Sequence, residues 1–335
     1  MTPLVRASGL RKVYGGGGLF RRQTVAAVDD VSLDIEAGET LGLVGESGSG
    51  KSTLGRMVIG LTEPSDGHVT VCGRTVARLG GDGRKALWRQ AQMVFQDPHS
   101  SLDPKMSVYD TLAEPLRNFG IARGAEAQAR IHQTLDACGL AKHAASRYPN
   151  EFSGGQRQRI GIARALIVRP RFIVADEPVS ALDVSIQAQI VNLLQDLKSQ
   201  FGLTYLFISH DLAVVRHMAD RVAVMYRGRL VEIGRSADLY ERPLHPYTQL
   251  LLRSVPIPEP RAEAARLARR GPAVAEAAPA DSGGCAFRAR CPHAQLPVCA
   301  EEEPPLSSRS GNRLVACHFA DGQRRQAASA QNFAA

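Results

Sequence analysis

The segment Gly45–Ser52 constrains the fold of this chain more than any other part of its sequence. It reads GESGSGKS, directly after the apolar run Leu41–Val44 and directly before the helical pattern Ser52–Ile59. Between a strand and a helix, the pattern G-x-x-x-x-G-K-[ST] is typical of a loop whose backbone N–H groups surround phosphate oxygens at the positive end of the helix. The sequence therefore predicts a nucleotide site, with Lys51 on the β- and γ-phosphates and the Ser52 hydroxyl on Mg²⁺.

Short apolar strands alternate with helical patterns from the start of the chain to about residue 254. The predicted strands are Val31–Ile35, Leu41–Val44, His68–Cys72, Phe172–Ala175 and Leu203–Ile208. The predicted helices are Ser52–Ile59, Gly155–Val168, Ser185–Phe201 and Leu212–Met218. Apolar strands separated by helices indicate an α/β fold with a mostly parallel, helix-covered sheet. Arg221–Ile233 differs, because two β runs joined at Arg227-Gly228 predict a hairpin.

Two composition changes divide the chain. Over about 104–168 helical patterns replace the β signal, so we predict a helical insert there. Pro256–Asp281 is rich in Ala, Pro, Arg and Glu, which indicates a linker. We therefore expect a nucleotide-binding domain over residues 1–255 and a C-terminal extension over residues 256–335.

Charge and hydropathy narrow the class of protein. The 335 residues include 41 basic and 33 acidic side chains, which gives a formal net charge of +8. This balance permits nucleic acid, an anionic membrane surface or small anions as partners. No stretch approaches the ~20 apolar residues of a membrane-spanning helix, and the N-terminus lacks the apolar core of a signal peptide. We therefore expect a cytoplasmic chain without a membrane span of its own.

A second acidic site accompanies the phosphate-binding loop. The apolar run Phe172–Ala175 is followed by Asp176, Glu177 and a proline. Ligands of parallel sheets bind at the carboxyl ends of the strands, so both carboxylates are expected near the phosphates. We expect Asp176 to hold Mg²⁺ through water and Glu177 to polarise the attacking water. The alternative is an exposed acidic turn.

The segment Phe152–Gln156, which reads FSGGQ, narrows the class further. By itself it could be a helix N-cap. Together with the preceding motifs it resembles the signature LSGGQ of the nucleotide-binding subunits of ABC transporters, with Phe152 in place of the usual Leu. The resemblance runs from about Leu4 to Ser254. It implies an ABC-type nucleotide-binding domain with a mostly parallel core sheet, an antiparallel β subdomain and a helical insert.

The family resemblance also implies roles for individual residues. Tyr14 would stack on adenine, Gln96 would be the Q-loop glutamine, Asp183 would lie in the D-loop and His210 would be the switch histidine. The residues implied for catalysis are Glu177, His210 and Gln96. Those implied for Mg²⁺ are Ser52, Gln96 and Asp176. The residues implied for ATP are Tyr14, Gly45, Glu46, Ser47, Gly48, Ser49, Gly50, Lys51, Ser52, Thr53, Gln96, Ser153, Gly154, Gly155, Gln156, Asp176 and Asp183.

In this family two nucleotide-binding domains close head to tail over two ATP molecules. Ser153, Gly155 and Gln156 would therefore cover ATP held by the phosphate loop of the partner. Glycine N–H groups at a helix start would meet the γ-phosphate from the opposite side.

Further segments resemble the dipeptide and oligopeptide permease ATPases. These are the residues around Phe95-Gln96-Asp97-Pro98, Pro178–Ser185 and the run His245-Pro246-Tyr247-Thr248. Details around Lys51 and Phe152 are similar to the second of the two paired ATPase types. The resemblance implies an ATP-hydrolysing subunit of a di- or oligopeptide importer, peripheral on the cytoplasmic face of the inner membrane. Its partners would be a paired ABC ATPase in a heterodimer, two transmembrane permease subunits and an extracytoplasmic peptide-binding protein, with no nucleic acid.

Three alternatives remain open at this point. Glutathione and nickel importers share the same features, so the cargo is not fixed. An ABC ATPase of DNA repair or translation would also fit the positive charge, although the insert has no long heptad run. A subunit that binds nucleotide without hydrolysing it is disfavoured by the presence of Glu177 and His210.

Four cysteines mark the extension. Cys285, Cys291, Cys299 and Cys317 follow the spacing C-x₅-C-x₇-C-x₁₇-C, which lacks the paired C-x₂-C knuckles of zinc ribbons. In a reducing compartment such a group indicates metal more often than disulfide. The permease resemblance implies a [4Fe–4S] cluster with a structural role. Structural zinc and the absence of any metal are the alternatives.

Overall fold

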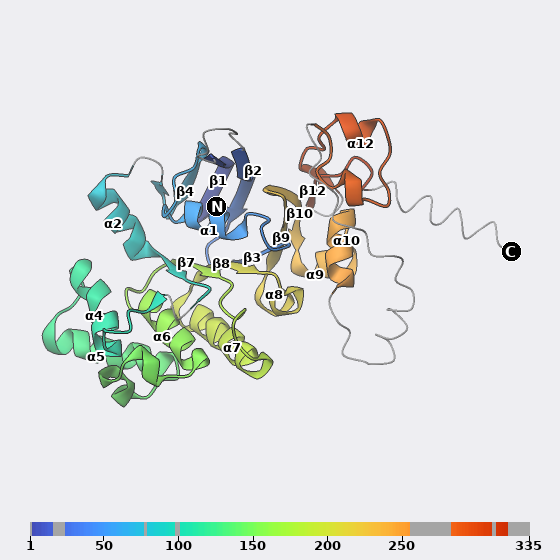
Figure 1. Ribbon diagram of the computed structural model, residues 1–335. Helices are drawn as coiled ribbons and strands as arrows, with labels where there is room; N and C mark the ends of the chain where they lie inside the picture. The colour runs from blue at the N-terminus through green and yellow to red at the C-terminus, as the bar shows by residue number, and fades with distance from the viewer. Residues whose placement is uncertain are drawn as a thin grey trace.

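The computed structural model describes residues 2–15, 24–76, 79–97, 101–254, 283–309 and 313–320. The linker predicted at Pro256–Asp281 therefore lies outside the described residues. Figure 1 shows a mixed α/β architecture, with several of the helices below the large sheet and the end of the described chain beside its outer strands.

The smaller sheet is antiparallel and lies at the N-terminal end of the chain. Its strand order is β2-β1-β4-β5. The strands are β1 (Val5–Gly15), β2 (Thr24–Ile35), β4 (Asp66–Val71) and β5 (Arg74–Thr75). This sheet corresponds to the antiparallel subdomain that the family resemblance implied, and the expected ABC-type fold is confirmed.

The larger sheet has the order β11-β12-β10-β9-β3-β8-β7-β6. Its parallel strands are β6 (Ala91–Val94), β7 (Phe172–Asp176), β8 (Thr204–Ser209), β3 (Thr40–Val44) and β9 (Arg221–Tyr226). Antiparallel strands continue it: β10 (Arg229–Arg235), β12 (Arg313–Val315) and β11 (Ser307–Arg309). The C-terminal extension thus supplies the two outer strands of the sheet that carries the phosphate-binding loop.

Alternate residues of the parallel strands face two apolar clusters. In β7, Phe172 and Val174 pack with the cluster under the small sheet, whereas Ile173 and Ala175 pack with the helical side. Burial on both faces explains the uninterrupted apolar runs of these strands.

The helices between β3 and β9 cover both sides of the large sheet. They are α1 (Lys51–Val58), α2 (Gly81–Gln90), α4 (Val108–Asn118), α5 (Gly124–Ala137), α6 (Gly154–Leu166), α7 (Val184–Phe201) and α8 (Leu212–Met218). The single turns η1 (Lys142–Ser146) and η2 (Pro149–Glu151) join α5 to α6. The residues predicted as a helical insert, 104–168, contain α4, α5 and α6. Among the described residues, no helix combines the length and apolar content that crossing a bilayer requires.

The described residues of the extension, 283–309 and 313–320, pack on the nucleotide-binding domain. That domain ends with α9 (Ser236–Glu241) and α10 (Pro246–Arg253), and the extension contains η3 (Arg288–Arg290) and α12 (Val298–Glu301). Phe287 is 2% exposed and belongs to the main apolar cluster of the domain. Glu232 of β10 is fully buried and pairs with Arg313 of β12. The extension is therefore held by a shared core and a shared sheet.

Candidate functional site

The phosphate loop, Gly45–Ser52, fills the space between β3 and α1. Two of its glycines are required by close backbone approaches. A Cβ on Gly45 would lie 2.2 Å from the carbonyl oxygen of Met225, and one on Gly50 would lie 2.0 Å from that of Ala27. Gly50 is also the N-cap of α1, with a φ of 104° that favours glycine. The first-turn N–H groups of α1 have no acceptor within the helix, so the loop is built to receive an anion.

The ammonium group of Lys51 is hydrogen-bonded to the loop itself. Its Nζ donates to the carbonyl oxygens of Gly45 at 2.8 Å and Glu46 at 2.9 Å, and the residue is 4% exposed. Burial lowers the pKa of Lys51, and the carboxylates of Glu177 and Asp176 act in the opposite direction. A buried ammonium whose close partners are uncharged oxygens of its own loop is suited to transfer to phosphate oxygens.

A hydroxyl and a carboxylate meet where a Mg²⁺ ion would be needed. Ser52 Oγ donates to Asp176 Oδ1 at 2.7 Å, which joins the start of α1 to the end of β7. Asp176 is 1% exposed, and burial raises its pKa while the Ser52 hydrogen bond lowers it. Hard oxygen donors of this kind, with waters and phosphate oxygens, are what Mg²⁺ takes in proteins. The donor set therefore fits the ion that the sequence implied.

Gln96 and His210, the other two residues implied for catalysis, both contact the carboxylate of Glu177. Gln96 Nε2 donates to Glu177 Oε2 at 2.9 Å, and His210 Nδ1 lies 3.2 Å from the same oxygen. The Glu177 side chain is 13% exposed and that of His210 is 55% exposed. The three side chains come from the ends of β6, β7 and β8, neighbouring parallel strands, so the sheet itself brings them together.

The backbone at Glu177 is unusual. Its φ is 46°, a left-handed conformation that costs a non-glycine residue roughly 1–2 kcal/mol. Its N–H donates to the carbonyl oxygen of Ile208 at 3.0 Å, which holds the turn against β8. Strain of this kind concentrates at functional sites, where it aims a side chain.

Tyr14 lies at the end of β1. Its side chain is 48% exposed, and Lys12 Nζ lies 5.3 Å from its ring centroid. An exposed aromatic face at this position is available for stacking on a base.

The signature segment lies on α6, among the helices below the sheet in Figure 1, whereas the phosphate loop precedes α1. Ser153 is the N-cap, and its Oγ accepts from the N–H of Gln156 at 3.4 Å. The Gln156 Oε1 accepts from the N–H of Ser153 at 3.0 Å, which completes a capping box. Gly155 is buried against Ile186 of α7. Asp183, the N-cap residue of α7, is exposed.

Residues from the C-terminal part of the chain also contact the phosphate loop, and the motif analysis did not give them a role. Tyr247 Oη accepts from the N–H of Glu46 at 2.9 Å. Arg290 donates to both carboxylate oxygens of Glu46, at 2.9 and 3.0 Å. The sequence signal was weak: Tyr247 stood only in a run typical of the permease ATPases, and Arg290 only beside Cys291.

The four cysteines lie in the described residues 283–309 and 313–320, which we call the C-terminal lobe. None forms a disulfide, and the N–H of Cys285 donates to the carbonyl oxygen of Cys299 at 2.9 Å. Burial, the largest influence, raises the pKa of Cys285, of Cys317 and of Cys291, the last to about 11. Within the described parts of the chain, no group of three or more His, Cys, Asp or Glu side chains is arranged to hold a metal ion. The geometry thus lends no support to the iron–sulfur or zinc prediction.

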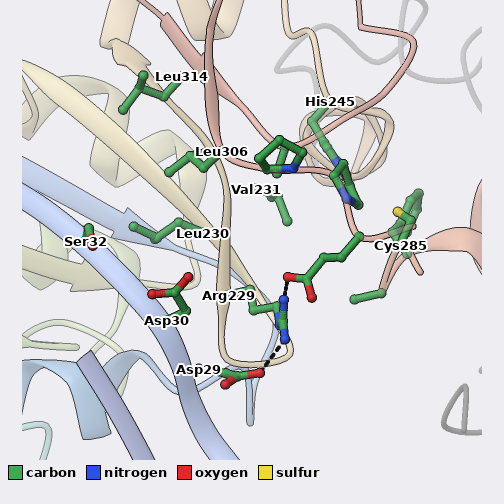
Figure 2. A pocket seen from close by; sticks show the side chains of 16 residues that line it. Asp29, Asp30, Ser32, Arg229, Leu230, Val231, His245, Cys285, Leu306 and Leu314 are labelled. Atoms are coloured by element: carbon green, nitrogen blue, oxygen red, sulfur yellow. Dashed lines mark hydrogen bonds and ion pairs between the residues drawn. The ribbon is translucent and has the colours of Figure 1, made fainter. Parts of the chain in front are cut away.

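The lobe meets the nucleotide-binding domain at a cavity of about 380 Å³ (Figure 2). Arg229 at its polar end pairs with Asp29 of β2 at 2.5 Å and with Glu303 of the lobe. His245 and Cys285 lie on the opposite wall. Burial lowers the pKa of His245 to about 4. Its Nδ1 accepts from the N–H of Tyr247 at 3.0 Å, so the neutral imidazole caps α10.

Comparisons with known proteins agree with this geometry. The family described as "ABC transporter" matches residues 28–180, and the family described as "Oligopeptide/dipeptide transporter, C-terminal region" matches residues 231–299. The chain is 48% identical to the oligopeptide transport ATP-binding protein AppF of Bacillus subtilis (strain 168), over 90% of this chain and 92% of AppF. It is 56% identical to the oligopeptide transport ATP-binding protein OppF of the same organism, over 74% of this chain and 82% of OppF.

A solved structure is similar as well. It is a dimeric, post-hydrolysis state of the ATP-binding cassette MJ0796, bound to ADP and Pi. The identity is 31% and the TM-score 0.63, over 69% of this chain and 98% of the other.

Proposed function

This chain belongs to the family of ABC transporter ATP-binding proteins, and from that membership we propose that it is the ATP-hydrolysing subunit of an importer for di- and oligopeptides. The relatives AppF and OppF are both named for oligopeptide transport, and the family of the C-terminal region is named for oligopeptides and dipeptides. They favour peptide cargo over glutathione, nickel, DNA repair or translation. The observation that carries hydrolysis is the meeting of Gln96 and His210 at Glu177, beside the pair of Ser52 and Asp176.

Each side chain has a defined task in the proposed reaction. Lys51 exchanges its carbonyl acceptors for the β- and γ-phosphate oxygens, and the N–H groups of the loop surround the same phosphates. Ser52, Asp176 and Gln96 would hold Mg²⁺, whose charge offsets that of the phosphates. Glu177 accepts the proton of the attacking water, and His210 stabilises charge that develops on the γ-phosphate. Tyr14 stacks on the adenine.

The signature segment is proposed to serve a second nucleotide. The helix α6 begins just after Ser153, whose side chain is exposed together with that of Gln156. A helix N-terminus that faces solvent is suited to cover phosphates held by another chain. We propose a head-to-tail pair of ATPase subunits, with a paired relative rather than a second copy. The similarity to a dimeric cassette supports the arrangement.

A groove beside the helical insert is the proposed docking surface for permease subunits. It has a volume of about 550 Å³ and lies between β6 and α4. Trp88, Met93, Phe95, Pro115 and Phe119 supply much of its apolar lining, and Glu114 and Arg164 supply charge. Gln96 follows Phe95 directly and is hydrogen-bonded to Glu177. A permease helix bound in this groove would therefore be linked to Glu177 through Gln96. We propose that two transmembrane permeases dock in this way at the cytoplasmic face of the membrane, with a peptide-binding protein on the other side.

We also propose that the four cysteines bind a [4Fe–4S] cluster with a structural role. Burial is the largest influence on Cys285, Cys291 and Cys317 and raises their pKa, while hydrogen bonds from backbone N–H groups act in the opposite direction. Gln295 donates an N–H to Cys299 Sγ at 3.4 Å. Donors around each sulfur are what a thiolate ligand set requires. Anaerobic purification should give about four iron and four sulfide per chain. About one zinc per chain, or linked cysteines without metal, would overturn this proposal.

Reconstitution tests the transport function. The full-length chain, co-purified with its membrane partners, should hydrolyse ATP in liposomes, and a peptide-loaded binding protein should stimulate that hydrolysis. Uptake of labelled oligopeptide, glutathione and nickel is compared in the same preparation. Glutathione or nickel uptake without peptide uptake would reassign the cargo, and tight binding to DNA or ribosomes without membrane partners would reject transport.

A further inference from the structure

Glu46, the second residue of the phosphate loop, is bonded through all three of its polar groups. Its N–H donates to Tyr247 Oη at 2.9 Å, and its carbonyl oxygen accepts from Lys51 Nζ at 2.9 Å. Its carboxylate receives both terminal nitrogens of Arg290, at 2.9 and 3.0 Å. Two of these partners lie 201 and 244 positions further along the chain. The conformation of the loop therefore depends on residues outside the ATPase motifs.

Aromatic rings hold Arg290 in place. Its guanidinium lies 6.0 Å from the ring centroid of Tyr226 and 5.8 Å from that of Phe287. The Tyr226 and Tyr247 rings are 4.5 Å apart, and Phe287 packs edge-on against Tyr226 at 5.4 Å. The Arg290 side chain is only 15% exposed. A planar guanidinium fixed in this way forms two parallel bonds with little loss of side-chain freedom.

The Glu46 carboxylate has an electrostatic cost for the proposed ligand. Its side chain is 42% exposed on a loop that has to receive a polyanion. An uncompensated negative charge at this position would repel the phosphates and attract Lys51 away from them. The bidentate ion pair with Arg290 neutralises the Glu46 carboxylate. Glu46 in turn raises the pKa of Arg290.

We propose that Arg290 and Tyr247 are positioning residues for ATP binding: Arg290 neutralises Glu46, and Tyr247 fixes its peptide group, so that the loop presents Lys51 and its N–H groups to the phosphates. This inference rests on the proposed ATPase function. It gives two residues outside the ATPase motifs a role in nucleotide binding that they exert through Glu46.

Calorimetric titration of the full-length chain with Mg·ATP tests the proposal. Arg290→Ala should raise the Kd about 10-fold, the size expected for a hydrogen-bonded charge pair. Adding Glu46→Gln to that variant should return the Kd to within about 3-fold of the wild type, because the repelling carboxylate is then gone. Glu46→Gln alone should raise the Kd less than Arg290→Ala does, because it removes the repelling charge together with the pair. The effect of Arg290→Ala should shrink at high salt.

Controls separate this proposal from simpler explanations. Arg84→Ala, with and without Glu63→Gln, breaks an exposed ion pair of 3.0 Å and should leave the Kd unchanged. Tyr247→Phe should weaken binding at low and high salt alike.

Several outcomes would overturn the proposal. They are an unchanged Kd in Arg290→Ala and a double variant that binds as weakly as Arg290→Ala. If Arg290→Ala does not fold, the proposal still fails when Tyr247→Phe leaves the Kd for Mg·ATP unchanged. A wild-type chain that does not bind Mg·ATP would instead reject the proposed function.

Discussion

The imidazole of His210 and the carboxylate of Glu177 meet at 3.2 Å, although the two residues follow different strands of the large sheet. Gln96 reaches the same carboxylate oxygen from a third strand. The parallel order β6-β7-β8 places three strand ends side by side, and the site arises at that edge.

Replacing Glu177 by Gln should stop turnover without disturbing this arrangement. The amide keeps the shape of the side chain and its contacts with Gln96, but it cannot accept a proton from water. The hydrolysis rate of the assembled complex should fall roughly 10²–10⁴-fold, and ATP should trap a closed pair of subunits. Phosphate release and size-exclusion chromatography measure the two effects. Glu63→Gln, at an exposed carboxylate, is the control, and near-wild-type turnover in Glu177→Gln would remove Glu177 from its proposed role.

Replacing Lys51 by Ala should abolish the phosphate contact and leave the fold intact. The hydrogen bonds of its ammonium go to groups of its own loop, so its loss breaks no hydrogen bond between elements. The Kd for Mg·ATP should rise at least ~10-fold, since hydrogen bonds to charged groups are worth about 1.5–3 kcal/mol. Calorimetry and circular dichroism report binding and folding. Lys85→Ala, on the exposed side of α2, should match the wild type in both; equal ATP affinity in Lys51→Ala would disprove the assignment.

The stability of the chain should fall in acid because of His245. Its pKa is lowered to about 4 in the fold, against an ordinary value near 6.5, so between these values the unfolded chain binds the additional proton. Stability from this group is fully present above pH ~6.5 and is lost towards pH ~4, by up to about 1.4 kcal/mol per pH unit. His245→Asn keeps an acceptor for the N–H of Tyr247 but does not titrate. Urea unfolding at several pH values should show a smaller acid loss in this variant; equal losses would contradict the prediction.

Removing Arg313 should loosen the extension. Glu232 would keep its bonds from the N–H groups of Leu244 and His245, but its buried charge would lose its only charged partner among the described residues. Breaking a buried pair in this way costs about 3–5 kcal/mol. Arg313→Met should therefore unfold at lower urea concentration and lose its C-terminal part to protease first. Adding Glu232→Gln should recover part of the stability, and a stable Arg313→Met chain would show that the pair is dispensable.

Much of the fold was predictable because its signals are local. The strand, glycine loop and helix around Lys51 lie within about twenty residues, and the apolar runs of β7 and β8 are buried on both faces. The prediction for β2 began seven residues late, at Val31 instead of Thr24, because Asp29 and Asp30 interrupt the apolar alternation. Asp30 has a φ of 53° and lies where the pairing of β1 and β2 is irregular.

Other parts could not be predicted because their partners are distant in the sequence. The outer strands β11 and β12 have three residues each, too few for any periodicity. The contact between Arg290 and Glu46 joins residues 244 positions apart, and neither residue type nor spacing indicates it. The extension also shares the core of the nucleotide-binding domain, because Phe287 is buried against Tyr226 and Tyr247, and no local sequence signal shows this.

The pairing of β10 with β12 has a consequence for how the protein is made. All described strands of the large sheet other than β11 and β12 are complete by residue 235. Synthesis reaches the end of β12 only at residue 315. Until then the free side of β10 is an open edge, which can pair with strands of other nascent chains. A polypeptide that stops short of β12 keeps that edge permanently. We expect such truncated chains to aggregate even when every ATPase motif is present, because β12 covers the edge of a sheet whose other described strands, except β11, are already complete.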